Sequence, residues 1–235
     1  MEKLELLYEG KAKRVYKTSD ADKYIVSYKD SATAFNGEKK GEIAGKGEVN
    51  NIMSNRMCSL LEKEGIKTHF IEQLNERETL VKAVSIVPLE VIIRNVAAGS
   101  FSKRFGVKEG TPLKQPTLEF SLKDDALGDP MINTSQVLAL DIATPREIEK
   151  IAYIATRVNE ILSEYFDKIG VKLIDFKIEV GRVDGDIVLA DEISPDTCRF
   201  WDKETNKKLD KDRFRQNLGE VEEVYKEMLN RVTNC

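Results

Sequence analysis

The sequence predicts an α+β fold in which helices pack on antiparallel sheets. Short segments of alternating apolar residues, joined by glycine-bearing turns, indicate antiparallel strands in much of the first 85 residues and again at 174–190. Longer segments carry apolar residues at helical spacing, at 49–61, 145–169 and 221–232. A chain of 235 residues is long enough for one large core or two small ones.

The N-terminal part is predicted to be a sheet with one helix packed on it. Its strands are expected at residues 4–8, 15–18, 24–28, 68–73 and 78–84. The helix carries Met53 and Met57 on its apolar side and is expected to end at Gly65. Before that helix, residues 30–37 are polar enough for a ligand loop, and residues 38–46 are charged and predicted to be mobile.

The C-terminal part begins with an apolar strand that a proline opens, at residues 86–95, and a further strand is expected at 118–122. Thr144 and Glu147 form a capping box with Pro145 at the first helical position. A helix is therefore predicted from Pro145 to about Gly170, with a packing role.

The hairpin at 173–192 is the segment around which a site is predicted. Even positions from 174 to 180 are apolar, whereas Asp175, Lys177 and Glu179 occupy odd positions, so one face is core and the other is charged. A second apolar run follows the turn and ends at Asp191. Polar turn formers come next, where a strand leaves its sheet, and such exits often carry binding sites.

The register of this hairpin decides whether the carboxylates meet. A bare two-residue turn at Asp184 and Gly185 would point Asp191 away from Glu179. One extra, bulged residue would put Lys177, Glu179 and Asp191 on one face, and we prefer this register because it also keeps the second apolar run on the core face.

Converging carboxylates need a cation. Two of them about 4 Å apart repel by roughly 4 kcal/mol at a near-surface dielectric. Lys177 would partly neutralise them, and Mg²⁺ held together with a nucleotide phosphate suits an oxygen-rich face. The alternative is an idle ladder of charges on an exposed sheet face.

Two further segments have the composition of anion sites. Gly10, Lys11, Ala12 and Lys13 lie between two predicted strands, where backbone N–H and ammonium groups can cover phosphates, although a basic surface turn has the same sequence. The segment from Arg94 through Gly99 and Ser100 to residue 104 supplies small residues, hydroxyls and cations at a predicted helix start. The alternative interpretation of this segment is an amphipathic helix with a solvated basic face.

Composition narrows the class of protein. A net charge of −4 argues against a general nucleic-acid footprint. Three cysteines without a pattern favour a reducing compartment. No apolar run approaches the roughly 20 residues of a membrane span, and no signal peptide is recognised, so a cytoplasmic protein is expected. The single histidine, His69, is expected to be structural.

Several segments resemble the SAICAR (phosphoribosylaminoimidazole-succinocarboxamide) synthetase family. They are the two signature runs at 86–100 and 173–179, together with residues 10–13, 34–37, 68–70, 191–199 and 210–215. The resemblance covers nearly the whole chain. Two positions depart from the family pattern: Val180 stands where phenylalanine is usual, with repacking expected, and Asn36 stands where many members carry aspartate.

The resemblance implies a two-lobed fold related to ATP-grasp enzymes and protein kinases, with an ATP-binding lobe at 1–84 and a substrate- and metal-binding lobe at 85–235. It implies that ATP, Mg²⁺, L-aspartate and carboxyaminoimidazole ribonucleotide give SAICAR, ADP and phosphate in purine synthesis. The usual mechanism has the imidazole carboxylate attack the γ-phosphate, and aspartate then displaces phosphate from the acyl phosphate. It also suggests a homodimer.

The resemblance further implies roles for particular residues. ATP would contact Gly10, Lys11, Ala12, Lys13, Lys82 and Val84. Glu179 and Asp191 would hold Mg²⁺, and with Lys177 they form the predicted catalytic set. The ribonucleotide would contact Arg94, Gly99, Ser100, Asp196 and Arg199. Residues 30–36 are the candidate aspartate subsite.

Three rival interpretations are open at this point. A kinase-type phosphotransferase would share the glycine loop and the paired acids, but the chain lacks His-Arg-Asp and Asp-Phe-Gly motifs. A nucleotide-binding regulatory module would leave Arg94, Ser100 and Arg199 unexplained as a second anion site. A purely structural protein would leave every charged cluster idle.

Overall fold

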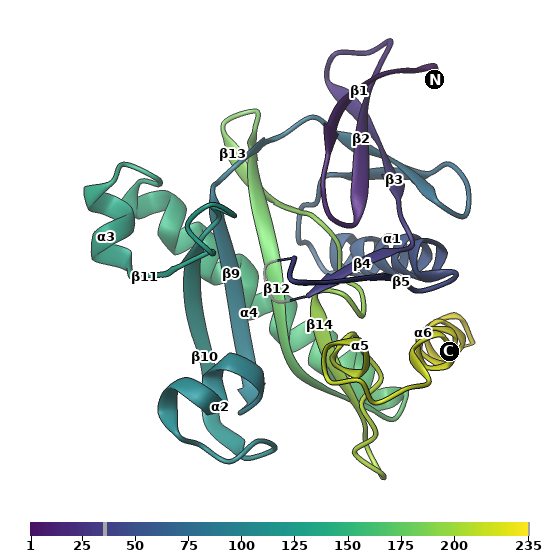
Figure 1. The fold of residues 1–235 in the computed structure, drawn as a ribbon. Coiled ribbons are helices and arrows are strands. Elements are labelled where there is room, and N and C mark those ends of the chain that lie inside the picture. Colours follow the sequence, from purple (N-terminus) through teal and green to yellow (C-terminus); the bar gives the residue numbers. More distant parts are fainter. Residues whose placement is uncertain (35–36, 235) are drawn as a thin grey trace.

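The computed structural model describes residues 1–34 and 37–234, and Figure 1 shows two sheets with helices between and behind them. The first sheet is antiparallel and has the order β1 (Lys3–Glu9), β2 (Lys13–Thr18), β3 (Lys23–Tyr28), β7 (Glu78–Lys82), β6 (Phe70–Gln73). It confirms the sheet predicted for the N-terminal part. The predicted ligand loop and mobile segment instead contain a small hairpin, β4 (Ser31–Ala34) with β5 (Lys39–Glu42).

The second sheet has seven strands. Its main path is β11 (Met131–Ile132), β10 (Pro112–Leu122), β9 (Leu89–Val96), β12 (Val171–Val183), β13 (Asp186–Ala190). Two further strands, β8 (Ser85–Ile86) and β14 (Cys198–Asp202), pair with β12. The long strand β12 is therefore the centre of this sheet. The alternation in its sequence predicts a strand here, and the structure confirms it. Val180 is fully buried, so it lies on the apolar face of the strand, and repacking at that position stays a prediction.

Six helices complete the described part of the chain. They are α1 (Lys46–Lys63), α2 (Gly99–Phe105), α3 (Thr134–Ala139), α4 (Pro145–Lys168), α5 (Asp212–Arg215) and α6 (Val221–Thr233). The predicted stop of α1 is confirmed, because Gly65 follows it with a positive φ of 84°. In Figure 1, α4 lies behind the second sheet, and α1 lies between the first sheet and α6.

The larger core is shared between the two parts of the chain. Met53, Met57 and Leu61 of α1 are buried in the same cluster as residues of β9, β12, α4 and α6. A separate, smaller cluster lies in the first sheet, around Val26 and Val81. Where α1 faces β7 it is polar: the hydroxyl of Thr79 lies 2.5 Å from Asn51 Oδ1 and 2.9 Å from Asn55 Oδ1.

The N-terminus of α4 is fixed by the predicted capping box. The Thr144 hydroxyl accepts from the Glu147 amide at 3.2 Å, and Glu147 accepts from the Thr144 amide at 2.8 Å. Glu147 is also paired with Arg182 of β12, whose terminal amino group lies 3.2 Å from Glu147 Oε2. These Arg182 and Thr144 hydrogen bonds lower the pKa of Glu147 from 4.5 to about 2.

Glu147→Gln is expected to lower the free energy of unfolding by about 1–2 kcal/mol at neutral pH, because glutamine keeps the cap but loses the charge. The folded-state pKa of Glu147 is depressed, so this stability is present above pH 4.5 and is lost as the pH falls toward about 2. Urea unfolding of both proteins across this pH range measures it. The control is Glu160→Gln, at an exposed ion pair of the same helix; an equal, pH-independent loss in both variants would contradict the prediction.

Candidate active site

A cleft of about 1020 Å³ lies between the two sheets. The turn at residues 10–13 and strand β7 border it on one side, and β9, β12 and residues 191–199 border it on the other. All fourteen residues predicted for the site fall in or beside it. Those named among its lining residues are Gly10, Lys11, Ala12, Lys13, Lys82, Val84, Arg94, Ser100, Lys177, Glu179, Asp191, Asp196 and Arg199.

The hairpin of β12 and β13 does not have the predicted register. Glu179 pairs with Ala190, and Val183 pairs with Asp186, so Asp184 and Gly185 form a bare two-residue turn. Both turn residues have positive φ values, 51° and 74°, which is the geometry that closes a hairpin without a bulge and that aspartate and glycine tolerate. The predicted bulge is therefore wrong.

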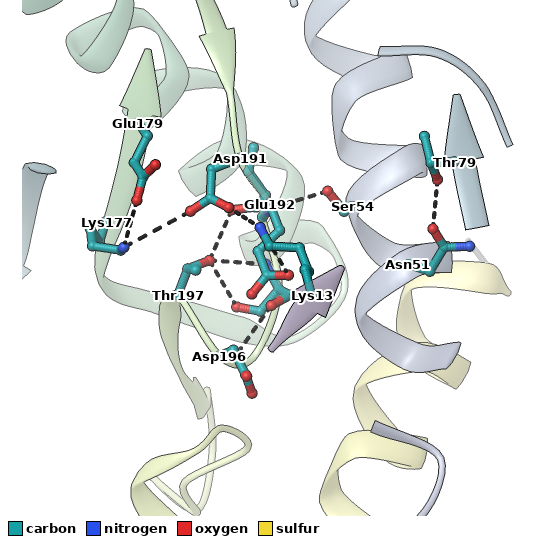
Figure 2. Close-up of polar contacts among 12 residues, drawn as sticks. Lys13, Asn51, Ser54, Thr79, Lys177, Glu179, Asp191, Glu192, Asp196 and Thr197 are labelled. Carbon is teal, nitrogen blue, oxygen red and sulfur yellow. Dashed lines mark hydrogen bonds and ion pairs between the residues drawn. The ribbon is translucent and has the colours of Figure 1, made fainter. Parts of the chain in front are cut away.

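The carboxylates nevertheless meet, for a different reason. Strand β13 ends at Ala190, and Asp191 adopts a left-handed conformation with φ of 62°. This backbone turn brings its side chain back toward β12, where Asp191 Oδ2 lies 3.9 Å from Lys177 Nζ. The same Nζ atom lies 3.2 Å from Glu179 Oε1. Figure 2 shows the three side chains converging. A non-glycine residue in this conformation is uncommon and is often found at functional sites.

The charged face of β12 is buried. The alternative interpretation, a functionless row of charges on an exposed sheet face, is therefore wrong. Glu179 is only 5% exposed, and Lys177 also pairs with Glu90 of β9 at 2.9 Å. Burial alone would raise the pKa of Asp191, but the ammonium groups of Lys13 and Lys177 hold it well below its usual range. Burial would likewise lower the pKa of Lys177, and the surrounding carboxylates raise it instead. Asp191 and Lys177 are therefore both charged at neutral pH.

The basic turn at residues 10–13 contacts the same group of carboxylates. Lys13 Nζ forms an ion pair with Asp191 and lies 3.7 Å from Glu192 Oε2. Lys11 points outward and pairs with Asp125 at 2.7 Å, across the cleft entrance. At the far edge, Val84 packs against Gly181, which has no room for a side chain because a Cβ there would lie 2.7 Å from Val84 Cβ.

A second cluster is organised around Asp175. Its carboxylate accepts from Arg94 at 2.8 Å and from Arg199 at 2.9 Å. Arg94 also donates to Ser100 Oγ at 3.1 Å, so both guanidinium groups and this hydroxyl lie at one end of the cleft. Burial would lower the pKa of Arg199, and Asp175 with Asp212 raises it instead.

Gly99 has a specific reason to be glycine. Its φ is 53°, and a Cβ built on it would lie 2.8 Å from Arg199 Cζ and closer still to the terminal amino group. Within the described residues, that amino group, Nη2, has no recorded hydrogen-bond partner, whereas Nε and Nη1 are paired. A guanidinium N–H donor without a protein partner, next to a glycine that leaves space for a ligand, is suited to binding an anion.

Two predicted positions have surroundings that the sequence does not indicate. Asp196 is fully engaged: it accepts from Lys46 at 2.8 Å, Lys211 at 3.2 Å and the Tyr225 hydroxyl at 2.6 Å. Asp30 of the candidate aspartate subsite pairs with Arg77 at 2.8 Å. It also accepts from the Gly47 amide at the start of α1, again at 2.8 Å. Asn36 lies outside the described residues.

Sequence reasoning missed several residues that line the cleft. Asp175 occupies an odd position of the strand like Lys177 and Glu179, so the alternation could have placed it with them in the site. Glu90 and Lys123 had no local signal, because they reach Lys177 and Glu179 through pairing of distant strands. His69, predicted to be structural, also lines the cleft, and burial lowers its pKa to about 4, so it is neutral at pH 7.

The donor set fits a divalent cation that is shared with a ligand. Among the described residues, no group of three His, Cys, Asp or Glu side chains is placed to hold a metal ion by itself. Mg²⁺ bound with a nucleotide needs only one or two carboxylates, with water and phosphate oxygens as the remaining ligands. Glu179 and Asp191, which share the ammonium group of Lys177, supply that number.

The architecture and the cleft define a class. They are those of an α+β enzyme in which a cleft between two sheets carries cations and paired carboxylates suited to nucleotide phosphates. Comparison with known proteins identifies the family. The model of the SAICAR synthetase family matches residues 6–232. The chain therefore belongs to the SAICAR synthetase family.

Individual relatives agree with this assignment. A phosphoribosylaminoimidazole-succinocarboxamide synthase of Lachnoclostridium phytofermentans is 63% identical, and the match covers 99% of each chain. The crystal structure of the synthase from Ehrlichia chaffeensis matches with a TM-score of 0.96 and 49% identity, covering 97% of this chain and 98% of that one. A SAICAR synthetase in complex with ADP matches with a TM-score of 0.95 and 50% identity, covering 98% of both. No helix in the described residues is long and apolar enough to span a bilayer.

Proposed function

We propose that the cleft binds ATP at residues 10–13, Lys82 and Val84, and carboxyaminoimidazole ribonucleotide at Arg94, Gly99, Ser100, Asp196 and Arg199. The chain is an ATP-dependent ligase that joins L-aspartate to this ribonucleotide in purine biosynthesis, giving SAICAR, ADP and phosphate. The observation that carries the site assignment is the convergence of Lys13, Lys177, Glu179 and Asp191 in one cleft that also contains the Arg94 and Arg199 cluster.

The chemistry requires that two anions approach each other. In the first step a carboxylate oxygen of the ribonucleotide attacks the γ-phosphorus, the bond to ADP breaks, and an acyl phosphate forms. Lys13 and Lys177, both cationic, are placed to offset the repulsion between these anions, which is the main task of such a site. In the second step the aspartate amine attacks the acyl carbon, phosphate leaves, and the nitrogen loses a proton.

Mg²⁺ is the implied metal, and Glu179 with Asp191 would hold it. When bound with ATP, it would offset negative charge on the phosphates during transfer. The protein's own residues do the remaining work of positioning. Lys177 orients Glu179 and Asp191, and Lys123 adds a second cation on Glu179.

We further propose that residues 1–84 form the ATP-binding lobe and residues 85–235 the substrate- and metal-binding lobe. The separate small core of the first sheet supports this division, with α1 as the element that connects the two. A homodimer and a cytoplasmic location are proposed on the family resemblance.

The activity is tested by measuring ADP release from ATP and Mg²⁺ with each substrate added separately and then together. ADP release that needs both the ribonucleotide and L-aspartate, with SAICAR as product, is the expected result. Tight ATP binding without turnover would favour a regulatory nucleotide-binding module, and phosphate transfer to another acceptor would favour a kinase. Omission of Mg²⁺ is expected to abolish ADP release.

Gly99→Ala is expected to raise the KM for the ribonucleotide by about tenfold or more and to leave the KM for ATP unchanged, because the new Cβ displaces the Arg199 guanidinium. Steady-state kinetics with each substrate varied gives both constants. Gly106→Ala is the matched control: Gly106 lies at the other end of α2 with a φ of 63° and nothing near its Cβ position. Equal effects in the two variants would mean that backbone strain alone is responsible.

A further inference from the structure

Lys13 lies between two acidic side chains that follow each other in sequence. Its Nζ atom is paired with Asp191 and lies 3.7 Å from Glu192 Oε2. Figure 2 shows these three side chains together. The ring of Tyr28 borders the same ammonium group, with its centroid 5.7 Å away. Lys13 therefore has a close partner and a second carboxylate within a short side-chain movement.

The carboxylate of Glu192 has an unusual environment. The side chain is 3% exposed, and in the described part of the chain its Oε2 atom has no hydrogen-bond donor. A buried carboxylate oxygen without a donor is rare, because the lost hydration is not replaced. The recorded ion pair of Glu192 is the long contact to Lys13. A buried, incompletely satisfied acid whose nearest cation is paired with another carboxylate suggests that the acid is fully satisfied in another state of the site.

That state follows from the proposed function, on which this inference rests. A divalent cation on Asp191 would repel the Lys13 ammonium group and compete with it for the same oxygens. Lys13 would then need another anion close by. Glu192 is near enough to provide it without moving the β1–β2 turn.

We propose that Glu192 is a positioning residue that accepts the Lys13 ammonium group when a divalent cation binds Asp191. In the metal-free protein Lys13 neutralises Asp191. In the metal-bound protein Lys13 pairs with Glu192 and stays in the cleft, beside the nucleotide phosphates. Without Glu192, Lys13 has no carboxylate other than Asp191 within reach among the described residues, so it stays closer to Asp191 and competes with the metal.

A double-mutant cycle tests this arrangement. The proteins are wild type, Glu192→Gln, Lys13→Met and the double variant, each saturated with ADP and titrated with Mn²⁺ as a spectroscopic substitute for Mg²⁺. Glu192→Gln is expected to weaken Mn²⁺ binding by about tenfold in the wild-type background and by less than about threefold in the Lys13→Met background. Glu192→Asp, which keeps the charge, is expected to restore most of the affinity.

The outcomes separate the possibilities. An equal loss of Mn²⁺ affinity in both backgrounds would mean that Glu192 acts by charge alone or as a ligand, and it would overturn this inference while leaving the ligase activity untouched. No loss in either background would overturn it as well. A wild-type protein that makes SAICAR but binds no Mn²⁺ at this site would overturn the metal assignment and this inference together. Asp186→Asn, at an exposed ion pair of the same hairpin, is the control and is expected to bind Mn²⁺ normally. Thermal unfolding of every variant verifies that each protein is folded.

Discussion

Asp191→Asn is expected to lower turnover by at least 10²–10³-fold while the protein remains folded. Asparagine has nearly the same volume as aspartate, so packing at this position is preserved. It removes the charge that pairs with Lys13 and that is proposed to hold Mg²⁺. The rate of SAICAR formation at saturating substrates measures the effect, and circular dichroism with thermal unfolding reports on the fold.

The matched control for this experiment is Asp186→Asn in the same hairpin. Asp186 pairs with Lys67 at 2.7 Å in an exposed position away from the cleft. Its variant is expected to retain turnover within about twofold of wild type, since exposed ion pairs contribute little. Near-normal turnover in Asp191→Asn would remove Asp191 from the metal site.

Arg94→Lys is expected to destabilise the protein by about 3–5 kcal/mol and to raise the KM for the ribonucleotide by about 10²-fold. The Arg94 guanidinium is 4% exposed and donates at once to Glu119, Asp175 and Ser100. A lysine ammonium group cannot donate to all three acceptors from one position, so at least one buried carboxylate loses its hydrogen-bond donor. Urea unfolding and kinetics with the ribonucleotide varied measure the two effects.

Arg104→Lys is the control, because Arg104 pairs with the same Glu119 but its side chain is 29% exposed. A loss of no more than about 1 kcal/mol and an unchanged KM are expected there. If Arg94→Lys behaved like Arg104→Lys, the Arg94 cluster would not be the ribonucleotide site.

The elements that are predictable from sequence are those whose signal is local. The alternation along β12, the capping box before α4 and the apolar stripe of α1 all depend on residues within a few positions of one another, and the structure confirms them. The family was available from the resemblance of several segments, and the family model confirms it. The residues proposed for the site were named from the same resemblance, and the structure places them in or beside one cleft.

The geometry of the site could not be predicted from the sequence, because it depends on local backbone conformation and on contacts between residues far apart in the chain. Asp184 and Gly185 suit a two-residue turn as well as a bulged one, and the preferred register was wrong. The left-handed backbone of Asp191 brings it to Lys177 in spite of that register, and the sequence does not mark it. Lys123 meets Glu179 across 56 positions of chain, which no local pattern can indicate.

The shared helix α1 has a consequence for how the protein unfolds. Its methionines and Leu61 are part of the core built by β9, β12, α4 and α6, although α1 precedes residue 84 in the chain. A polypeptide cut at 84/85 would leave each fragment with an incomplete core, because large buried side chains on both fragments would be exposed to water. The two proposed lobes are therefore expected to unfold in a single cooperative transition, with ligand binding to either of them raising the melting temperature of the whole chain.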